Sequence, residues 1–409
     1  MKRFCQLMFS LMVIIFWDKS HAASDTLLIA LTGPFSGGSS DIGISMRNGA
    51  KLVIREVNDQ GGLDIDGKKY HIEVLELDDE GKNETGASIA QKLCQIPSLN
   101  AVIGTANTGV AVAGDHFYQN AKIIRILTPA TGTAAMAQWH QDTISDLYIF
   151  RFAANDLIQV TMLLEEAIQK MGLKRLALIH DVTNYGISGR DDILKQIKNY
   201  PGVELVLIER FNTGDKDMKF QIQKIKESKA QVLIVWGGGP EAAAIANEMH
   251  HIGLHIPLMG GWTLSMASYL DNAGAHAEGT FMPQTFMGQN QSKQAGDFVN
   301  RYYDTYKVDH IPSPMSAAEG YDAIKILMAA FQQAKSLDSL QVKNALENLE
   351  KPISGVITTW IKPYDKWNPK NPISHEAFRP QEVVMAVVKD KKIVFVYDED
   401  RTQLSRTRD

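Results

Sequence analysis

The chain of 409 residues contains little cysteine and little excess charge. Its two cysteines, Cys5 and Cys94, are too few for a disulfide framework or a zinc cluster. A formal net charge of −5 offers no broad basic surface, so we expect no nucleic-acid partner. Hydrophobic residues make up 44% of the chain and charged residues 22%, proportions that exclude a disordered or collagen-like polypeptide.

Long apolar runs are also missing. The run Phe4–Trp17 is shorter than the roughly 20 residues of a membrane-spanning helix, and no later run is longer. It follows two cations and precedes small residues at a cleavage spacing, Ser20–Ala22, which predicts a cleaved secretory signal over residues 1–22 and export to the periplasm. An uncleaved membrane anchor is the alternative. Cleavage would change the formal charge from −5 to −7 and leave Cys94 as a single buried, inert thiol.

Catalytic signatures are absent as well. Gly237–Pro240 follows a predicted strand but has neither dinucleotide-loop spacing nor a phosphate-binding lysine, so it is either an anion loop or a tight turn. The histidines His250, His251 and His255 do not have the spacing of a zinc site, and a solvated helix end explains them better. No nucleophile elbow occurs. We therefore expect no enzymatic activity, no metal and no cofactor.

What the chain does contain is a regular alternation of apolar runs and amphipathic segments. Apolar runs without polar alternation predict strands buried on both faces, as in parallel sheets. Two series of strand–helix units, about 23–150 and 155–280, predict two doubly wound α/β domains. Further helices and two late strands follow them. The predicted strands are Thr26–Leu31, Ile72–Leu77, Ala101–Gly104, Ile123–Thr128, Leu176–His180, Val203–Arg210, Val232–Trp236, Pro257–Met259, Val383–Val388 and Ile393–Tyr397.

Small hydroxyl residues follow three strands of the first series, in the loops Thr32–Gly38, Thr105–Gly109 and Thr128–Thr133. Ligands of open α/β sheets bind outside the carboxyl ends of the strands. Hydroxyl groups and free N–H groups at helix starts suit an anion such as a carboxylate. The alternative is that each serine or threonine only caps a helix.

Several motifs in order resemble the branched-chain amino-acid type of periplasmic binding proteins. The resemblance covers nearly the whole chain after residue 22, and the ordered set is more specific than any one motif. It implies a type I, Venus-flytrap fold, in which two doubly wound parallel-sheet lobes are joined by three crossovers and close on a ligand. The motifs are Leu31–Gly37, Asn48–Ala50, Asn58 with Gly61–Gly62, Val102–Gly104, Thr128–Ala130, His180–Asp181 with Tyr185–Gly186, Ala273–Gly274 with Glu278–Gly279, and Gly320–Ala323.

The same resemblance implies how the chain is divided. The first lobe would comprise residues 23–152 plus 283–355, and the second 153–282 plus 356–409. The crossovers would lie near Phe152–Ala154, Phe281–Pro283 and Ser354–Thr358.

It also implies a set of ligand-binding residues. Thr108 matches a hydroxyl residue at a helix start that holds the ligand carboxylate. Ala130 and Thr131 match the next loop, whose backbone and hydroxyl groups complete the binding of that carboxylate. Thr133 is the alternative to Thr131 for the hydroxyl of this loop. Tyr185 matches a second-lobe aromatic residue that closes over the ligand. The remaining predicted positions in and around these loops are Ser36, Ile42, Ala106, Asn107, Gly238 and Trp262.

Trp262 departs from the family pattern. Amino-acid binders of this type usually have an acidic residue there, which pairs with the ligand's ammonium group, and an aromatic residue where Gly238 or Gly239 stands. A tryptophan offers only a cation–π contact in place of that ion pair. We therefore hypothesise a pocket reshaped for a flat ligand, and a solute other than a simple branched-chain amino acid. The alternative is that Trp262 packs away from the cleft.

The resemblance implies a substrate-binding protein of an ABC importer. It would be a monomer that captures a small carboxylate- or amide-bearing solute and delivers it to membrane permease subunits. A ligand sensor that signals to a membrane receptor or kinase is the alternative function.

Overall fold

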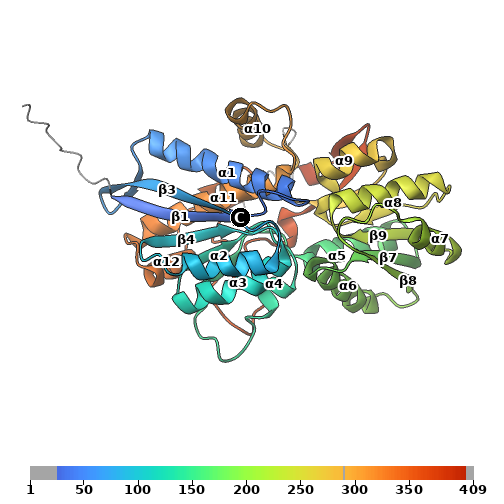
Figure 1. The fold of residues 1–409 in the computed structure, drawn as a ribbon, viewed down its shortest axis with the longest axis horizontal. Helices are drawn as coiled ribbons and strands as arrows, with labels where there is room; N and C mark the ends of the chain where they lie inside the picture. The colour runs from blue at the N-terminus through green and yellow to red at the C-terminus, as the bar shows by residue number, and fades with distance from the viewer. Residues whose placement is uncertain (1–24, 289–290, 402–409) are drawn as a thin grey trace, which may run out of the picture.

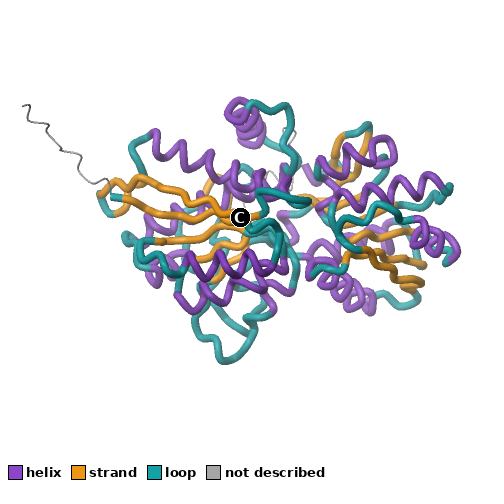
Figure 2. The backbone as a smooth tube through the Cα atoms, in the orientation of Figure 1, coloured by secondary structure: helices purple, strands orange, loops and turns teal. Residues whose placement is uncertain are grey.

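The computed structural model describes residues 25–288 and 291–401, arranged as two lobes side by side (Figure 1). The predicted signal over residues 1–22 lies outside the described residues. Within them, no helix combines the length and the apolar character needed to cross a bilayer. Each lobe is a sheet with helices on both faces, and Figure 2 shows the strands enclosed by helices.

The first lobe is built on a six-stranded sheet of order β2-β3-β1-β4-β5-β6. Its strands run parallel, except that the short β2 pairs antiparallel with β3. The centre of the sheet is apolar on both faces because the neighbouring side chains of β1 enter different cores, Ile29 into one and Ala30 into the other. The strands are β1 (Thr26–Gly33), β2 (Leu63–Ile65), β3 (Lys68–Asp78), β4 (Leu99–Gly104), β5 (Ile124–Leu127) and β6 (Ile149–Arg151).

Early and late helices share this lobe. The helices α1 and α11 pack along each other on one face, where Figure 1 draws blue beside orange, and α2 with α3 covers the other face. Residues far apart in the sequence thus build one core. The helices are α1 (Ser40–Asp59), α2 (Asn83–Leu93), α3 (Thr108–Ala121), α4 (Ala134–Ala137), α10 (Lys293–Tyr306), α11 (Pro314–Ala334) and α12 (Ser339–Leu346), and a small hairpin joins β12 (Ile353–Ser354) to β13 (Thr359–Trp360).

The second lobe has a seven-stranded sheet of order β15-β14-β11-β10-β9-β7-β8. The strands β11, β10, β9, β7 and β8 run parallel to one another. The strands β14 and β15 add an antiparallel edge beside β11. Its strands are β7 (Arg175–Asp181), β8 (Glu204–Phe211), β9 (Val232–Trp236), β10 (Leu258–Gly260), β11 (Phe281–Gln284), β14 (Val384–Lys389) and β15 (Lys392–Phe395). Its helices are α5 (Asp156–Leu164), continued by a π-helical turn, α6 (Asn184–Gln196), α7 (Lys219–Glu227), α8 (Gly239–His251) and α9 (Ala267–Ala273).

The third passage between the lobes lies later than expected. Trp360, Tyr364 and Phe378 pack into the core of the first lobe, and the chain reaches the second core only between Val383 and Val384. The expectation that residues from 356 onward belong to the second lobe is therefore corrected to residues from about 384 onward. The physical reason is that these large aromatic side chains fill the first-lobe core against Phe150 and Phe152.

Candidate ligand-binding site

A cavity of about 200 Å³ lies between the lobes. It is smaller than the roughly 300–1,000 Å³ of pockets for drug-sized ligands, so it suits a small solute. Its walls come from residues at or just after the carboxyl ends of parallel strands, β1, β3, β4 and β5 in the first lobe and β7, β8, β9 and β10 in the second. The lining residues are Gly38, Ser39, Ile42, Glu80, Gly81, Ala106, Asn107, Thr108, Thr131, Asp181, Thr183, Tyr185, Thr213, Gly237, Gly238, Pro240, Glu241, Trp262 and Thr263.

The start of α3 forms part of the first-lobe wall. Thr108 is its first residue, and Asn107 precedes it as the N-cap. The Asn107 side chain does not cap the helix and instead donates from Nδ2 to Ser39 Oγ, at 3.3 Å. A helix start without a side-chain cap leaves backbone N–H groups available to an anion, and the helix dipole favours negative charge there.

Trp262 faces the cleft. Its side chain is 3% exposed and packs with Ile42 and Ala106 of the first lobe and with Met315. Its indole Nε1 donates to Thr131 Oγ1 across the cleft, at 3.3 Å. Trp262 therefore lies against the first lobe as part of the cavity wall, and the alternative that it packs elsewhere is wrong.

Tyr185 closes the cavity from the second lobe. It stands in the first turn of α6, and its ring lies 5.9 Å from that of Trp236. Burial raises the pKa of Tyr185 well above its usual value. Among the described residues its buried hydroxyl has no hydrogen-bond partner, and neither has Asn107 Oδ1 on the opposite wall.

Two buried carboxylates stand on the second-lobe wall. Asp181 ends β7, and its Oδ1 accepts from the backbone N–H of Thr183 at 2.8 Å and of Gly186 at 3.1 Å. Glu241 lies in the first turn of α8, and its Oε1 accepts from the N–H of Gly214 at 2.7 Å. Burial is the main cause that raises the pKa of Asp181, and the charge of Glu241 adds to the rise.

Two predicted site residues do not line the cavity. Ser36 is exposed in the loop before α1, where its hydroxyl contacts the Asp78 carboxylate and helps lower the pKa of that group. Ala130 is fully buried and packs into the first-lobe core. Both lie in the predicted loops, but those loops turn these two side chains away from the cleft.

The other predicted positions lie together on the cavity wall, namely Ile42, Ala106, Asn107, Thr108, Thr131, Tyr185, Gly238 and Trp262. Of the two competing hydroxyls, Thr131 lines the cavity, whereas Thr133 Oγ1 donates to Asp192 Oδ2 of α6 at 2.5 Å. Thr133 thus joins the lobes outside the cavity.

Sequence reasoning missed most of the second-lobe wall, including Asp181, Thr213 and Glu241. The same strand-end rule that selected the first-lobe loops also applies to Asp181, which directly follows the predicted strand Leu176–His180. Glu241 had a weaker signal, as an acidic residue in the turn after Gly237–Pro240.

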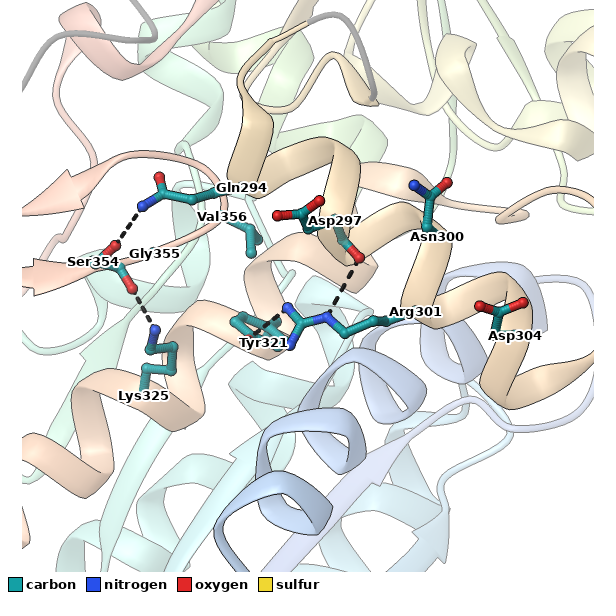
Figure 3. A pocket seen from close by; sticks show the side chains of 10 residues that line it. All are labelled: Gln294, Asp297, Asn300, Arg301, Asp304, Tyr321, Lys325, Ser354, Gly355 and Val356. Carbon is teal, nitrogen blue, oxygen red and sulfur yellow. Dashed lines mark hydrogen bonds between the residues drawn. The ribbon is translucent and has the colours of Figure 1, made fainter. Parts of the chain in front are cut away.

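A larger hollow lies elsewhere, on the first lobe. Its volume is about 500 Å³, and it is lined by polar residues of α10 and α11 and of the β12–β13 hairpin (Figure 3). Its cations are already paired, because Arg301 donates to Tyr321 and Glu56 and Lys325 donates to the carbonyl of Ser354. Among the described lining residues, both cations of this hollow therefore already have hydrogen-bond partners.

The histidine group lies at another hollow, on the second lobe. His250 stacks on His276 at 4.0 Å, and both border a surface hollow with His255. Within residues 25–288 and 291–401, no three histidine, cysteine or acidic side chains are placed to hold a metal ion.

Comparison with known proteins agrees with this architecture. A sequence model described as periplasmic binding protein matches residues 26–375. Leu/Ile/Val-binding protein homolog 3 of Brucella melitensis is 26% identical over 341 residues, 83% of this chain and 88% of the relative.

Solved structures show the same two-lobe fold. The branched-chain amino acid transporter substrate binding protein LivJ from Streptococcus pneumoniae, in complex with isoleucine, has a TM-score of 0.75 at 23% identity, covering 90% of this chain and 98% of its own. A Rhodopseudomonas palustris ABC transporter solute binding protein in complex with benzoate has a TM-score of 0.74 at 19% identity, covering 91% and 95%. The chain therefore belongs to the periplasmic binding protein family, which consists of binding proteins and not of enzymes.

Proposed function

We propose that the protein is the extracytoplasmic substrate-binding protein of an ABC importer and that it captures a small carboxylate- or amide-bearing solute between its lobes. The solute would be an amino acid or, as Trp262 suggests, an amino-acid-like or aromatic compound. The observation that carries the proposal is the cavity between the lobes at the carboxyl ends of both sheets, with the uncapped start of α3 in its wall. The solved relatives named above hold isoleucine and benzoate, which are both carboxylates.

The carboxylate end of the solute would lie at Thr108. There the hydroxyl group and the free N–H groups of the first turn of α3 would donate to it, while Thr131 borders the same wall. Hydrogen bonds to a charged group are worth about 1.5–3 kcal/mol each, so a few of them account for most of a micromolar affinity of about 8 kcal/mol. The loaded, closed protein would then dock on the permease subunits.

A thermal-shift screen tests the proposal directly. A panel of amino acids, aromatic acids, amides and ureas is added to the purified protein. A true ligand at 100 times its dissociation constant should stabilise the fold by about 2.7 kcal/mol. If no member of the panel raises the melting temperature, the proposed solute class is wrong.

The variant Thr108→Val tests the assigned end of the site. It keeps the side-chain shape but removes the hydroxyl, so affinity for the ligand found in the screen should fall roughly 10-fold or more in calorimetry. Thr161→Val is a matched control, because that hydroxyl donates to the Leu157 carbonyl within α5, away from the cavity. Equal affinity of Thr108→Val and wild type would contradict the assignment of the carboxylate end.

A further inference from the structure

The loop that contains Thr131 is held from inside the first lobe by Arg151. Arg151 is the last residue of β6, and its side chain is 1% exposed. Its Nη1 donates to the Thr131 carbonyl at 3.0 Å and to the Gly132 carbonyl at 2.8 Å. Because Thr131 lines the cavity and Arg151 does not, a residue behind the wall fixes the backbone of one in it.

The same loop limits where Thr108 can lie. A Cβ atom built on Gly132 would lie 2.3 Å from Thr108 Oγ1, so the loop backbone packs directly against the hydroxyl at the proposed carboxylate end. From the second lobe, Trp262 Nε1 donates to Thr131 Oγ1. The hydroxyls of Thr108 and Thr131 therefore both depend on where Arg151 holds the two carbonyl groups.

Glu376 binds the other edge of the guanidinium. Arg151 Nε donates to Glu376 Oε2 at 2.7 Å, and Nη2 donates to Oε1, so the pair is bidentate. The two side chains are 2% and 3% exposed. Since the carboxylate balances the charge of the guanidinium, the pair presents fixed hydrogen-bond donors to the loop without a net charge.

Glu376 belongs to the late segment, residues 361–383, which packs on the first lobe before the chain enters the second. Backbone hydrogen bonds on both sides of Glu376 attach the late segment to β6. The Arg151 N–H donates to the His375 carbonyl at 2.8 Å, and the Ala377 N–H donates to the Arg151 carbonyl at 2.9 Å. The carboxylate therefore reaches the guanidinium in a fixed position, although 225 residues separate the two in the sequence.

From these contacts we propose that Arg151 and Glu376 are positioning residues of the ligand site, which hold the backbone of Thr131 and Gly132 in place for solute binding. The late segment thus supports the site, although none of its residues lines the cavity in the described part of the chain. This inference rests on the proposed function, because it assigns the pair a role in binding a solute.

Hydrogen exchange of the ligand-free protein tests the inference without any solute. The Asp156 amide donates to the Thr131 carbonyl at 3.0 Å, and the Ala135 amide donates to the Gly132 carbonyl at 3.1 Å. These two reporter amides therefore bond to the carbonyls that Arg151 holds. Arg151→Lys keeps the charge, but a single ammonium cannot replace the planar fork that joins a carboxylate to two carbonyls. Exchange of both amides should become roughly 10-fold faster than in wild type.

Arg125→Lys is the matched control. Arg125 lies on the neighbouring strand β5, is 2% exposed and donates to the buried Asp115 at 3.1 Å. Neither Arg125 nor Asp115 lines the cavity, so this variant breaks a similar buried pair away from the loop. The reporter amides should keep their wild-type rates in the control. Wild-type rates in Arg151→Lys, or an equal rise in both variants, would overturn the inference and leave the proposed function standing.

Glu376→Gln tests the pair from the late segment, and it replaces Arg151→Lys if that variant does not fold. Glutamine keeps the shape and one acceptor oxygen but removes the charged, bidentate partner. Calorimetry uses leucine, phenylalanine and benzoate as probes. The probe that binds wild type most tightly should lose roughly 10-fold in affinity in Glu376→Gln and in Arg151→Lys, and nothing in Arg125→Lys.

A structural role gives a different result. If the Arg151 and Glu376 variants have lower melting temperatures but wild-type affinities, the pair only stabilises the lobe and the inference is overturned. If wild type binds none of the three probes, that result counts against the proposed solute class, and the reporter amides decide on the pair. A rise in their exchange in Glu376→Gln would then support the inference, and wild-type rates would contradict it.

Discussion

At the scale of single residues, Asp156 is the most exceptional group beside the cleft. Its side chain is fully buried at the start of α5, and its two carboxylate oxygens have no hydrogen-bond partner among the described residues. Burial raises the pKa of Asp156 to about 7, against the opposing influence of the nearby Thr131 hydroxyl and Trp236 indole. The folded protein therefore tends to hold a proton that the unfolded chain releases at lower pH.

This shift predicts a pH-dependent stability. When folding raises the pKa of an acid, the protonated group contributes to the free energy of unfolding. That contribution is fully present below about pH 4 and is lost as the pH rises to about 7. The variant Asp156→Asn has no proton to lose at this position. The difference between its free energy of unfolding and that of wild type should therefore rise, in favour of the variant, as the pH increases over this interval. One pKa unit corresponds to about 1.4 kcal/mol, which limits the gain to about 4 kcal/mol. Urea unfolding at several pH values measures it, and parallel profiles of the two proteins would contradict the prediction.

Cys94 shows a smaller departure at the same scale. The sequence predicts a buried, inert thiol, but the side chain is only partly buried at the end of α2. Desolvation nevertheless raises the pKa of Cys94 to about 11, so the thiolate form is scarce at neutral pH.

At the scale of elements, the close packing of α1 on α11 holds the first lobe together. A Cβ atom on Gly49 of α1 would lie 1.9 Å from the carbonyl oxygen of Ala317. A Cβ atom on Gly320 of α11 would lie 2.2 Å from that of Met46. Each helix therefore presents a glycine to the backbone of the other, and this contact joins an early and a late segment of the chain.

The substitution Gly49→Ala should therefore destabilise the protein by about 1–3 kcal/mol, because the helices must move apart. Gly114→Ala is a matched control on α3, where the nearest atom to the added Cβ would be Ala90 Cβ at an ordinary 3.4 Å. The control should be neutral or slightly stabilising, since alanine favours helix over glycine. Chemical denaturation compares the two, and equal stabilities would contradict the role of the glycine contact.

At the scale of the whole molecule, the lobes touch beside the cavity as well as around it. Thr133 Oγ1 of the first lobe donates to Asp192 Oδ2 of α6, and the N–H of Ala134 donates to Ser188 Oγ at 3.3 Å. These contacts exist only when the lobes are close together. They hold α6 against the first lobe at residues that do not line the cavity, so we expect them to favour a closed arrangement of the lobes.

Breaking one of them should weaken ligand binding from a distance. In Asp192→Ala the closed state loses a hydrogen bond worth about 0.5–1.5 kcal/mol, so the affinity for the ligand found in the screen should fall roughly 2- to 10-fold. X-ray scattering should show a larger radius of gyration for the ligand-free variant. The neighbouring Asp191→Ala lies outside this contact and should match wild type. An unchanged affinity of Asp192→Ala would mean that this contact does not favour closure.

Much of this architecture can be read from the sequence alone. Local periodicity predicts the central strands and helices, because burial on both faces and amphipathic packing leave their pattern in neighbouring residues. The strand-end rule with the family resemblance selects Thr108, Thr131 and Tyr185, which line the cavity. The short edge strand β2 was missed, and so were β6 in the first-lobe sheet and β11 in the second-lobe sheet, which lie where the sequence predicted only crossovers between the lobes.

Only the tertiary structure decides what depends on distant segments meeting. It brings Trp360 and Phe378 into the first-lobe core, which moves the last passage between the lobes to about residue 384. It also turns Ser36 and Ala130 away from the cleft and places Asp181 beside Glu241. The sequence by itself determined the fold class and the family, and it predicted several first-lobe residues of the cavity wall, because local patterns and ordered motifs carry that information. The wall of the cavity comes from loops at the ends of eight different strands, and no local pattern records how those loops converge.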